Sequence, residues 1–296
     1  MKQLEFDNIS VDRIPRDVFA HHDINVDILR VDKIHSIISG NKWFKLKKYL
    51  EDAKQQNKKT IVTFGGAWSN HIVATAAASS MNGFMSAGII RGEEPAVLSP
   101  ALKQAKAMGM QLVFMTREDY KIKKLPPDFL KDEYYLINEG GYGLKGAEGI
   151  AQMIEYCNKD NFTHFACAAG TGTMMAGLLM TVLPQQKVLG ISVLKNNNDL
   201  EKKVKDLLKN NSTQLEIMHD YHFGGYAKYT AKLLNFMNEF YRQTNIPADF
   251  VYTGKLFYAI ADLARKKYFP SGSRLLIIHS GGLQGNASLG NGKLIF

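Results

Sequence analysis

The chain has 296 residues, of which 45% are hydrophobic, which is enough to bury a sizeable core and to build two domains. Its formal net charge is +9, but the lysines are spread along the chain without a basic tail or an arginine–aromatic cluster, so a small anionic ligand is a more economical partner than nucleic acid. Two cysteines, Cys157 and Cys167, exclude a disulfide framework and favour buried free thiols in a reducing compartment, the cytoplasm.

Two long stretches, residues 61–90 and 165–186, lack Asp, Glu, Lys and Arg and could suggest membrane spans. Each is interrupted by Gly, Ser, Thr or Asn, and in a bilayer these breaks would leave backbone groups unpaired. We therefore expect a buried strand, a loop and a buried helix in each, and no membrane partner. The N-terminus carries early acidic residues and no continuous apolar core, so we expect no signal peptide.

The first half of the chain alternates between strand and helix patterns. A strand over 26–31 leads through a loop, 32–40, to a helix over 42–56. Strands are then predicted over 60–64, 84–90, 111–115 and 134–137, and helices over 70–81 and from Pro100, capped by Ser99, to Gly109. The polar stretch 117–133 is expected to be a surface loop with a short helix. This rhythm predicts an α/β fold with parallel sheets and helices on both faces.

The second half continues the alternation after a glycine-rich loop, 138–143, which we interpret as a crossing between domains. Strands are predicted over 163–168, 188–194 and 274–278, and helices over 146–157, 174–182, 200–209, 227–244 and 256–268. We expect a large domain made of residues 1–45 and 139–296, a small domain of 46–138, and a ligand between them.

Lys42 stands where a glycine-containing loop, Ser39–Asn41, meets a helix. The pattern after it predicts one apolar face, with Lys45, Lys47 and Lys48 mostly toward solvent. A lysine in a concave, partly dry site loses its proton easily and can then attack a carbonyl carbon. Taken alone, a solvated lysine is the simpler interpretation, so the hypothesis depends on other motifs.

A second motif, Gly170-Thr171-Gly172-Thr173-Met174, follows a predicted strand and opens a helix. The glycines permit close approach of the backbone to a phosphate, and the hydroxyls and the helix start add donors. This motif fits neither the dinucleotide pattern G-x-G-x-x-G nor a nucleotide P-loop. We therefore expect a phosphate that is not part of a nucleotide.

A third motif, residues 65–71, places Trp68, Ser69, Asn70 and His71 at another helix start, where a carboxylate would be well bound; alternatively, Ser69 or Asn70 only caps the helix. Tyr226 and Tyr252 each lie beside glycine before a predicted helix, and each could be an ordinary packed aromatic. The histidines lack metal-ligand spacing, so no metal is expected.

Five motifs in order resemble the 1-aminocyclopropane-1-carboxylate deaminase/D-cysteine desulfhydrase family. They are Ser39-Gly40-Asn41-Lys42 with Lys45-Leu46, Gly65-Gly66 with Ser69-Asn70-His71, Thr171-Gly172-Thr173 with Ala176-Gly177, Tyr252-Thr253-Gly254-Lys255, and His279-Ser280-Gly281-Gly282. The resemblance covers nearly the whole chain. It implies a two-domain fold type II enzyme, similar to the tryptophan synthase β-subunit, with pyridoxal 5′-phosphate as cofactor and a homodimer as the assembly.

The resemblance also implies roles for single residues. It makes Lys42 the lysine that binds the cofactor covalently, and residues 170–174 its phosphate cradle. Ser69 would bind the substrate carboxylate together with Asn70, His71 and the neighbouring Trp68, and Asn70 would also bind the ring hydroxyl of the cofactor. Tyr226 and Tyr252 would be the two active-site tyrosines. The sequence departs from the family at Phe44, where Arg is usual, and at Trp68, where Gln is usual.

Thr253 and Ser280 separate the two chemistries of the family. Deaminases that open a cyclopropane ring carry Glu and Leu at these positions, so this chain resembles the desulfhydrase type. A neutral hydroxyl beside the pyridine nitrogen does not hold a proton there, which suits loss of an α-proton with a β-thiolate more than ring opening. We expect D-cysteine to give pyruvate, sulfide and ammonia. The alternatives are 1-aminocyclopropane-1-carboxylate deamination, a related D-amino-acid lyase, or a degenerate protein that binds the cofactor without turnover.

Overall fold

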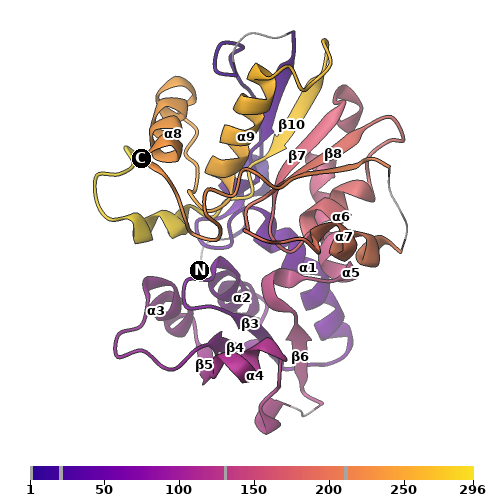
Figure 1. The fold of residues 1–296 in the computed structure, drawn as a ribbon. Coiled ribbons are helices and arrows are strands. Elements are labelled where there is room, and N and C mark those ends of the chain that lie inside the picture. Colours follow the sequence, from indigo (N-terminus) through magenta and orange to yellow (C-terminus); the bar gives the residue numbers. More distant parts are fainter. Residues whose placement is uncertain (1–2, 20–22, 130–131, 210–212) are drawn as a thin grey trace.

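The computed structural model describes residues 3–19, 23–129, 132–209 and 213–296. They form two sheets with helices packed on both faces of each, so the expected α/β fold class is confirmed (Figure 1). In Figure 1 the larger sheet occupies the upper part of the molecule and the smaller sheet the lower part.

The larger sheet has six strands in the order β1-β2-β10-β7-β8-β9. All neighbours are parallel except β1 and β2, which are antiparallel, and the last strand in the chain, β10, lies between β2 and β7. The strands are β1 (Val11–Arg13), β2 (Asn25–Leu29), β7 (His164–Ala169), β8 (Lys187–Ser192), β9 (Leu215–Met218) and β10 (Arg274–Ile278).

The smaller sheet has four parallel strands in the order β5-β4-β3-β6. The strands are β3 (Thr60–Gly65), β4 (Met85–Arg91), β5 (Met110–Met115) and β6 (Tyr134–Ile137). The limits proposed for the small domain, 46–138, enclose all four strands. The first limit falls inside helix α1 (Asn41–Gln55), which packs against helices on both sides, α5 and α2, without interruption.

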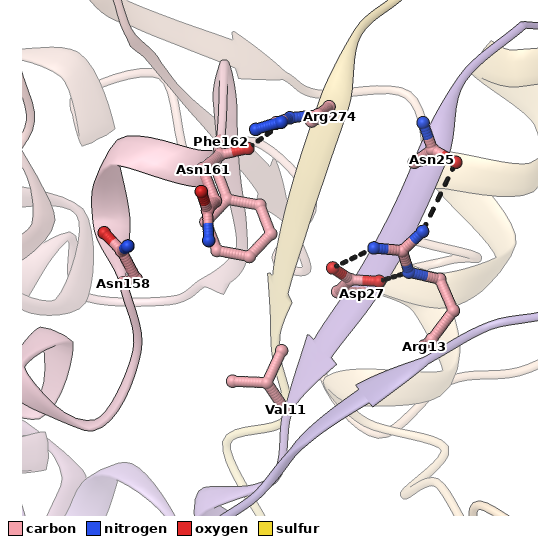
Figure 2. Close-up of a pocket in the computed structure, with 8 residues that line it drawn as sticks. All are labelled: Val11, Arg13, Asn25, Asp27, Asn158, Asn161, Phe162 and Arg274. Atoms are coloured by element: carbon pink, nitrogen blue, oxygen red, sulfur yellow. Dashed lines mark hydrogen bonds and ion pairs between the residues drawn. The ribbon is translucent and has the colours of Figure 1, made fainter.

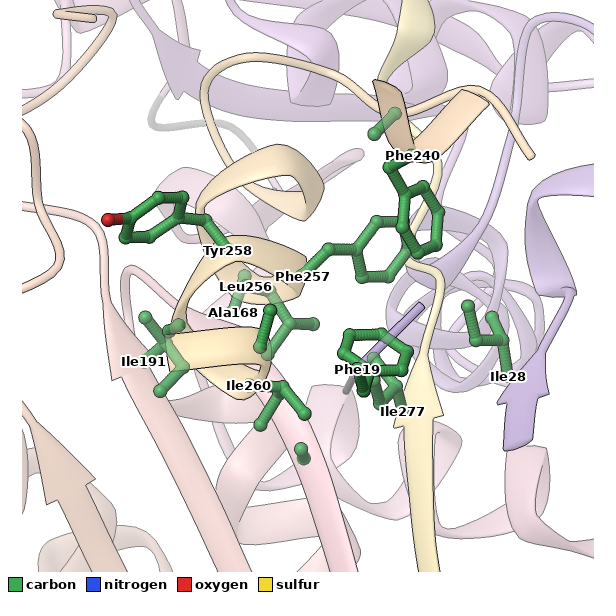
Figure 3. Close-up of a cluster of buried hydrophobic side chains, with 14 of the residues drawn as sticks. Phe19, Ile28, Ala168, Ile191, Phe240, Leu256, Phe257, Tyr258, Ile260 and Ile277 are labelled. Atoms are coloured by element: carbon green, nitrogen blue, oxygen red, sulfur yellow. The ribbon is translucent and has the colours of Figure 1, made fainter. Parts of the chain in front are cut away.

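Apolar side chains on both faces hold the larger sheet between helices. Helices α8 and α9 cover one face, where the rings of Phe240 and Phe257 lie 4.8 Å apart beside Ile28 and Ile277 of the strands (Figure 3). Helices α5, α6 and α7 cover the other face. The helices are α5 (Leu144–Met153), α6 (Thr173–Leu179), α7 (Leu200–Leu208), α8 (Ala231–Thr244) and α9 (Thr253–Arg265).

The smaller sheet is covered on one face by α1, α2 and α3 and on the other by α4, through buried clusters of Ala, Ile, Leu and aromatic side chains. Ser99 caps α3 by accepting a hydrogen bond from the N–H of Leu102, with Pro100 at the first position, as predicted. The remaining helices are α2 (Asn70–Met81), α3 (Pro100–Ala107) and α4 (Arg117–Lys121).

Most predicted elements are confirmed within one or two residues, but several limits were wrong. The helix expected over 227–244 begins at Ala231, because Ala227 has a left-handed backbone (φ 52°) and Thr230 caps the helix. The helix expected over 256–268 is α9, which begins at Thr253. The helix expected to reach Cys157 ends at Met153 and continues only as a 3₁₀ turn.

Two short strands, β1 and β9, were not predicted: β1 has only three residues, too few to show a period, and the four residues of β9 include a charged one, Glu216, so they form no continuous apolar run. Cys167 is fully buried in β7 and Cys157 is partly buried, and both are free thiols. Among the described residues, none of the helices combines the length and the apolar character that crossing a bilayer requires.

Candidate active site

The loop before Lys42 packs directly against the loop after β10. Gly40 has φ 63°, and a Cβ at this position would collide with the backbone of Ser280. The N–H of Asn41 donates to the Ser280 carbonyl at 3.3 Å. Only glycine fits this position, and it brings the first and last motifs of the chain together at the start of α1.

Lys42 is the second residue of α1 and its side chain is partly buried. Its Nζ donates to Asn41 Oδ1 at 2.9 Å and lies 5.9 Å from the centre of the Tyr252 ring. Burial lowers the pKa of Lys42 to about 8, although the nearby Asp249 carboxylate opposes this shift. A sizeable fraction of Lys42 is therefore a neutral, nucleophilic amine at physiological pH.

Lys45 is buried one helical turn after Lys42, so the expectation that it points toward solvent was wrong. Its Nζ donates to the Gly140 carbonyl at 3.5 Å. Burial, followed by repulsion from Lys42, lowers its pKa to about 7. The spacing of three residues from Lys42 is the signal in the sequence that could have placed it in the site.

His71 is buried below the two lysines. Its Nε2 lies 2.9 Å from Thr63 Oγ1, and its Nδ1 has no hydrogen-bond partner in the described part of the chain. Burial, with repulsion from Lys42 and Lys45, lowers the pKa of His71 to about 3. His71 is therefore neutral, and its ring contacts Thr63.

The loop before α6 has the form of an anion cradle. Gly172 is left-handed (φ 84°), and the hydroxyls of Thr171 and Thr173 lie 3.0 Å apart. The N–H groups of Thr171 and Gly172 make no hydrogen bond to the described residues, and the first N–H groups of α6 have no acceptor within the helix. Gly170 begins this cradle, held through its carbonyl by the Asn197 amide at 3.1 Å.

Met174 and Lys45 close this cradle from two sides. Met174 is buried, with its Sδ 3.5 Å from the Asn41 amide. On the other side, a Cβ at Gly140 would lie 3.1 Å from the Thr171 side chain, and the Gly140 carbonyl accepts the hydrogen bond from Lys45. A buried lysine thus stands near the free N–H groups, and a phosphate bound there would favour its protonated form.

The loop between β3 and α2 faces the same region. Ser69 caps α2 by accepting hydrogen bonds from the N–H groups of His71 and Ile72, at 3.2 and 3.4 Å. The capping role left open by the sequence is therefore present, while the hydroxyl proton of Ser69 stays available to a ligand. Asn70 Nδ2 reaches the Gly282 carbonyl at 3.5 Å, and Trp68 is 51% exposed.

Tyr226 and Tyr252 are brought together, with ring centres 6.3 Å apart in an edge-to-face arrangement. Tyr252 lies at the start of α9 and its ring is close to Gly170, 3.7 Å from where a Cβ would be. Burial holds the pKa of Tyr252 well above its usual value, so its hydroxyl stays protonated. Tyr226 is 44% exposed on the side of the loop open to solvent.

The hydroxyl of Thr253 is engaged on both sides by Asp249. It donates to Asp249 Oδ1 at 2.8 Å and accepts from the Asp249 N–H at 2.8 Å. Ser280 is also buried, but its hydroxyl makes no hydrogen bond to the described residues. Of the two hydroxyls singled out in the sequence, Ser280 therefore has the free proton to donate.

Asp249 organises the start of α9, and no role for it was predicted from the sequence. Its carboxylate accepts from the N–H groups of Val251, Tyr252 and Thr253 as well as from the Thr253 hydroxyl, all at 2.8–2.9 Å. Burial raises the pKa of Asp249, and these hydrogen bonds oppose the shift. Because all four partners are donors, the ionised form is the one that satisfies them.

Lys255, one turn further along α9, holds the loop that carries Tyr226. It is fully buried, and its Nζ donates to the carbonyls of His222 and Gly225 at 2.8 and 2.7 Å. Asp249, just before α9, and Lys255, in its first turn, thus position the two tyrosines. Asp249 holds the backbone of Tyr252 and Lys255 holds the turn before Tyr226.

A cavity of about 310 Å³ lies at the amino ends of the strands of the larger sheet, away from these motifs (Figure 2). Arg13 pairs with Asp27 at its edge, and Arg274 Nε donates to the Asn161 carbonyl. Its strongest charges are therefore engaged within the protein. None of the predicted site residues lines it.

Comparison with known proteins decides the family. A family model described as "Pyridoxal-phosphate dependent enzyme" matches residues 22–281. The chain belongs to this family. It is 30% identical, over 88% of this chain and 85% of the relative, to the "Putative 1-aminocyclopropane-1-carboxylate deaminase" of Pyrococcus furiosus.

Two further relatives agree with the resemblance seen in the sequence. The "Bifunctional D-cysteine desulfhydrase/1-aminocyclopropane-1-carboxylate deaminase, mitochondrial" of Arabidopsis thaliana is 28% identical, over 84% of this chain and 70% of the relative. A solved structure titled as that of an "ACC deaminase homologue" has a TM-score of 0.77 at 28% identity and covers 97% of this chain and 92% of that one. The chain is a fold type II pyridoxal-phosphate dependent enzyme.

The residues present fit pyridoxal phosphate. The free N–H groups of the 170–174 cradle suit the phosphate, whose charge would favour the protonated form of Lys45, and Lys42 is an amine with a lowered pKa that can react with the aldehyde. The departure at Phe44 affects packing, because this side chain is buried against Tyr156 with ring centres 5.9 Å apart. The departure at Trp68 lies on the exposed loop between β3 and α2.

Replacing Asp249 with asparagine tests its role as a positioning residue. We expect Asp249→Asn to lower the free energy of unfolding by about 2–3 kcal/mol, because it weakens hydrogen bonds to a buried charge. The pKa of Lys42 should also fall, since the carboxylate now raises it. The midpoint of the pH dependence of pyridoxal phosphate attachment to the apoenzyme should therefore shift below about 8.

Asp262→Asn is the matched control, because it also replaces a carboxylate by an amide, but within α9 at a residue that accepts from the Tyr221 hydroxyl. It should leave the pH midpoint in place. An unchanged midpoint in Asp249→Asn would show that the Asp249 charge does not act on Lys42.

Proposed function

We propose that the enzyme catalyses β-elimination and deamination of a small D-amino acid, with D-cysteine converted to pyruvate, sulfide and ammonia. The observation that carries this proposal is the neutral pair at positions 253 and 280. Resemblance places these side chains at the ring nitrogen of the cofactor. There, Ser280 has a free hydroxyl, and the nearby Asp249 carboxylate is already bound by four donors.

Pyridoxal phosphate, when bound, withdraws electrons from the α-carbon of an attached amino acid and so makes its α-proton acidic. The protein supplies the groups that orient the substrate and move this proton. The Ser69 hydroxyl and the start of α2 bind the substrate carboxylate. Lys42 Nζ, with its lowered pKa, accepts the α-proton.

The tyrosines suit the departure of the β-substituent. Tyr252 is held protonated by burial beside Lys42, so its hydroxyl can donate a hydrogen bond to a leaving thiolate. Tyr226 stands next to it on the solvent side. At the ring nitrogen the chain would offer the Ser280 hydroxyl and no free carboxylate to hold a proton, which would favour substrates with an acidic α-proton and a good leaving group.

The proposal predicts which products form. Pyruvate should form from D-cysteine and β-chloro-D-alanine with a kcat/KM at least about 10²-fold above that for 2-oxobutanoate from 1-aminocyclopropane-1-carboxylate, as expected when a general acid–base arrangement suits only one substrate. Both ketoacids can be measured in one assay with the purified holoenzyme. The same substrates test the second candidate, deamination of the cyclopropane amino acid, which the names of the relatives favour. Comparable kcat/KM values would replace our proposal with that one.

Introducing the deaminase residue at position 253 should not convert the activity. Thr253 is fully buried and its hydroxyl bonds to Asp249, so Thr253→Glu would set a second carboxylate against the first. We expect loss of stability and of β-elimination in this variant, without ring opening.

A further inference from the structure

A second cavity, of about 610 Å³, lies at the carboxyl ends of three strands of the smaller sheet. Arg91 ends β4, Arg117 follows β5 and Glu139 follows β6, so their side chains gather at one edge of this parallel sheet. The loop of Ser69 begins at the same edge, after β3. The cavity is lined by Arg91, Arg117, Tyr120, Lys121, Lys123 and Glu139.

This cavity adjoins the substrate side of the active site. Arg91 Nη2 lies 3.7 Å from where a Cβ would stand at Gly66, in the loop that also carries Ser69. Glu139 begins the turn whose next residue, Gly140, touches Thr171 of the cradle. The charges of Arg91 and Glu139 also act on the pKa of Tyr226, with opposite signs. A group extending from the substrate toward Tyr226 would therefore meet the cavity.

The lining of the cavity has an excess of positive charge. Four cationic side chains line it against one carboxylate, and the Glu139 carboxylate already pairs with Lys123. Within the described residues, Arg91, Arg117 and Lys121 make no ion pair. This leaves guanidinium groups free at the edge of the site, and guanidinium binds planar carboxylates and phosphates through paired hydrogen bonds.

The aromatic ring of Tyr120 lies against two of these cations. Tyr120 is buried, with Lys123 Nζ 3.7 Å and Arg91 Cζ 5.9 Å from the centre of its ring. Its hydroxyl lies near Glu139 but makes no hydrogen bond of normal geometry to the described residues. The Tyr120 ring thus holds Lys123 and Arg91 at the cavity through contact with their charges.

We propose that this cavity binds an anionic group on the substrate, so that the enzyme prefers amino acids whose β-substituent carries a carboxylate, sulfonate or phosphate. This inference rests on the proposed β-elimination and names the substrate class for it. With O-phospho-D-serine the enzyme removes the α-proton and breaks the bond between the β-carbon and oxygen. Together with one water, the substrate then yields pyruvate, ammonium and inorganic phosphate, with no oxidant or reductant.

Equilibrium binding tests the cavity independently of turnover. The probe is D-2-amino-3-phosphonopropionate, whose carbon–phosphorus bond resists elimination. The control ligand is D-2-aminobutyrate, an amino acid whose side chain is uncharged. Calorimetry on the holoenzyme should show the phosphonate binding at least about tenfold more tightly, with the preference falling as salt rises, because the cations are exposed. Equal affinities would overturn the proposal. So would inorganic phosphate binding as tightly as the phosphonate, because the cavity would then recognise phosphate without the amino acid.

Three variants locate the effect. Arg91→Gln and Arg117→Gln should each reduce the preference for the phosphonate about tenfold or bring it to parity, with little change for D-2-aminobutyrate. Lys124→Gln removes a neighbouring charge that pairs with Asp119 outside the cavity, and it should leave the preference unchanged. An equal loss of the phosphonate preference in all three variants would indicate a general electrostatic effect of positive charge and would overturn the assignment to this cavity.

The outcomes separate this inference from the function proposed above. Suppose that neither β-chloro-D-alanine nor O-phospho-D-serine yields pyruvate, while the phosphonate preference and its loss in Arg91→Gln are observed. The proposed β-elimination is then contradicted, and the anion-binding role of the cavity is supported. If both substrates yield pyruvate with equal kcat/KM and the phosphonate shows no preference, the reaction stands and the cavity assignment fails.

Discussion

Lys42→Ala is expected to abolish covalent attachment of pyridoxal phosphate and to lower kcat by about 10²–10⁴-fold, because it removes both the amine that binds the aldehyde and the base that accepts the α-proton. Of the two buried amines at this end of α1, Lys42 lies beside Tyr252, whereas Lys45 is bonded to Gly140 next to the cradle. The visible absorbance of the lysine-bound cofactor should disappear. Borohydride reduction of the wild type should label Lys42, as identified by peptide mapping.

Lys47→Ala is the control, because Lys47 lies on the same helix but bonds Gln152 at 3.0 Å. This variant should keep the absorbance and the activity. Borohydride label on Lys45 or Lys47 in the wild type would contradict the assignment and with it the orientation of the whole site.

Gly172→Val is expected to abolish retention of pyridoxal phosphate. Gly172 is left-handed, and a Cβ there would lie 2.8 Å from the Val204 side chain, so the valine can be placed only by moving the cradle. Thr173→Ala should be milder and weaken binding by about 1.5–3 kcal/mol, as expected for one hydrogen bond to a charged group. Cofactor content after gel filtration and the dissociation constant by titration measure both effects.

Gly109→Val separates backbone strain from damage to the cradle. Gly109 has nearly the same conformation (φ 86°), but no atom lies within 4 Å of its added Cβ. This variant should lose stability while keeping the cofactor. Equal cofactor content in the wild type and in Gly172→Val would show that the 170–174 loop does not hold the phosphate.

The sheets and most helices follow from the sequence because apolar strands, glycine loops and capped helices alternate so regularly. Helix α2 begins and ends at the predicted residues, Asn70 and Met81, because Ser69 caps it and the run of small apolar residues ends there. The limits of α8 and α9 could not be predicted in the same way. They depend on the left-handed backbone of Ala227 and on the carboxylate of Asp249, and neither leaves a periodic signal.

The proposed site was predictable where a motif stands at a loop–helix junction, as with Lys42 and residues 170–174. It was not predictable where the role depends on contacts between segments far apart in sequence. In the sequence Lys255 is indistinguishable from a surface lysine, and only the hydrogen bonds to the carbonyls of His222 and Gly225 show its role. Arg91 acquires its place beside Gly66 only because parallel strands end at a common edge.

The position of β10 has a consequence for the order in which the chain folds. The smaller sheet is complete once Ile137 has been made, because its strands are consecutive in the chain. In the larger sheet, β2 and β7 are separated by β10, which lies near the C-terminus. During synthesis, β2 can therefore pair only with β1 until β10, its parallel partner, emerges more than two hundred residues later. A nascent chain arrested before Arg274 should resist protease only over the smaller sheet, and the full chain should gain protection in its N-terminal strands together with its last helix.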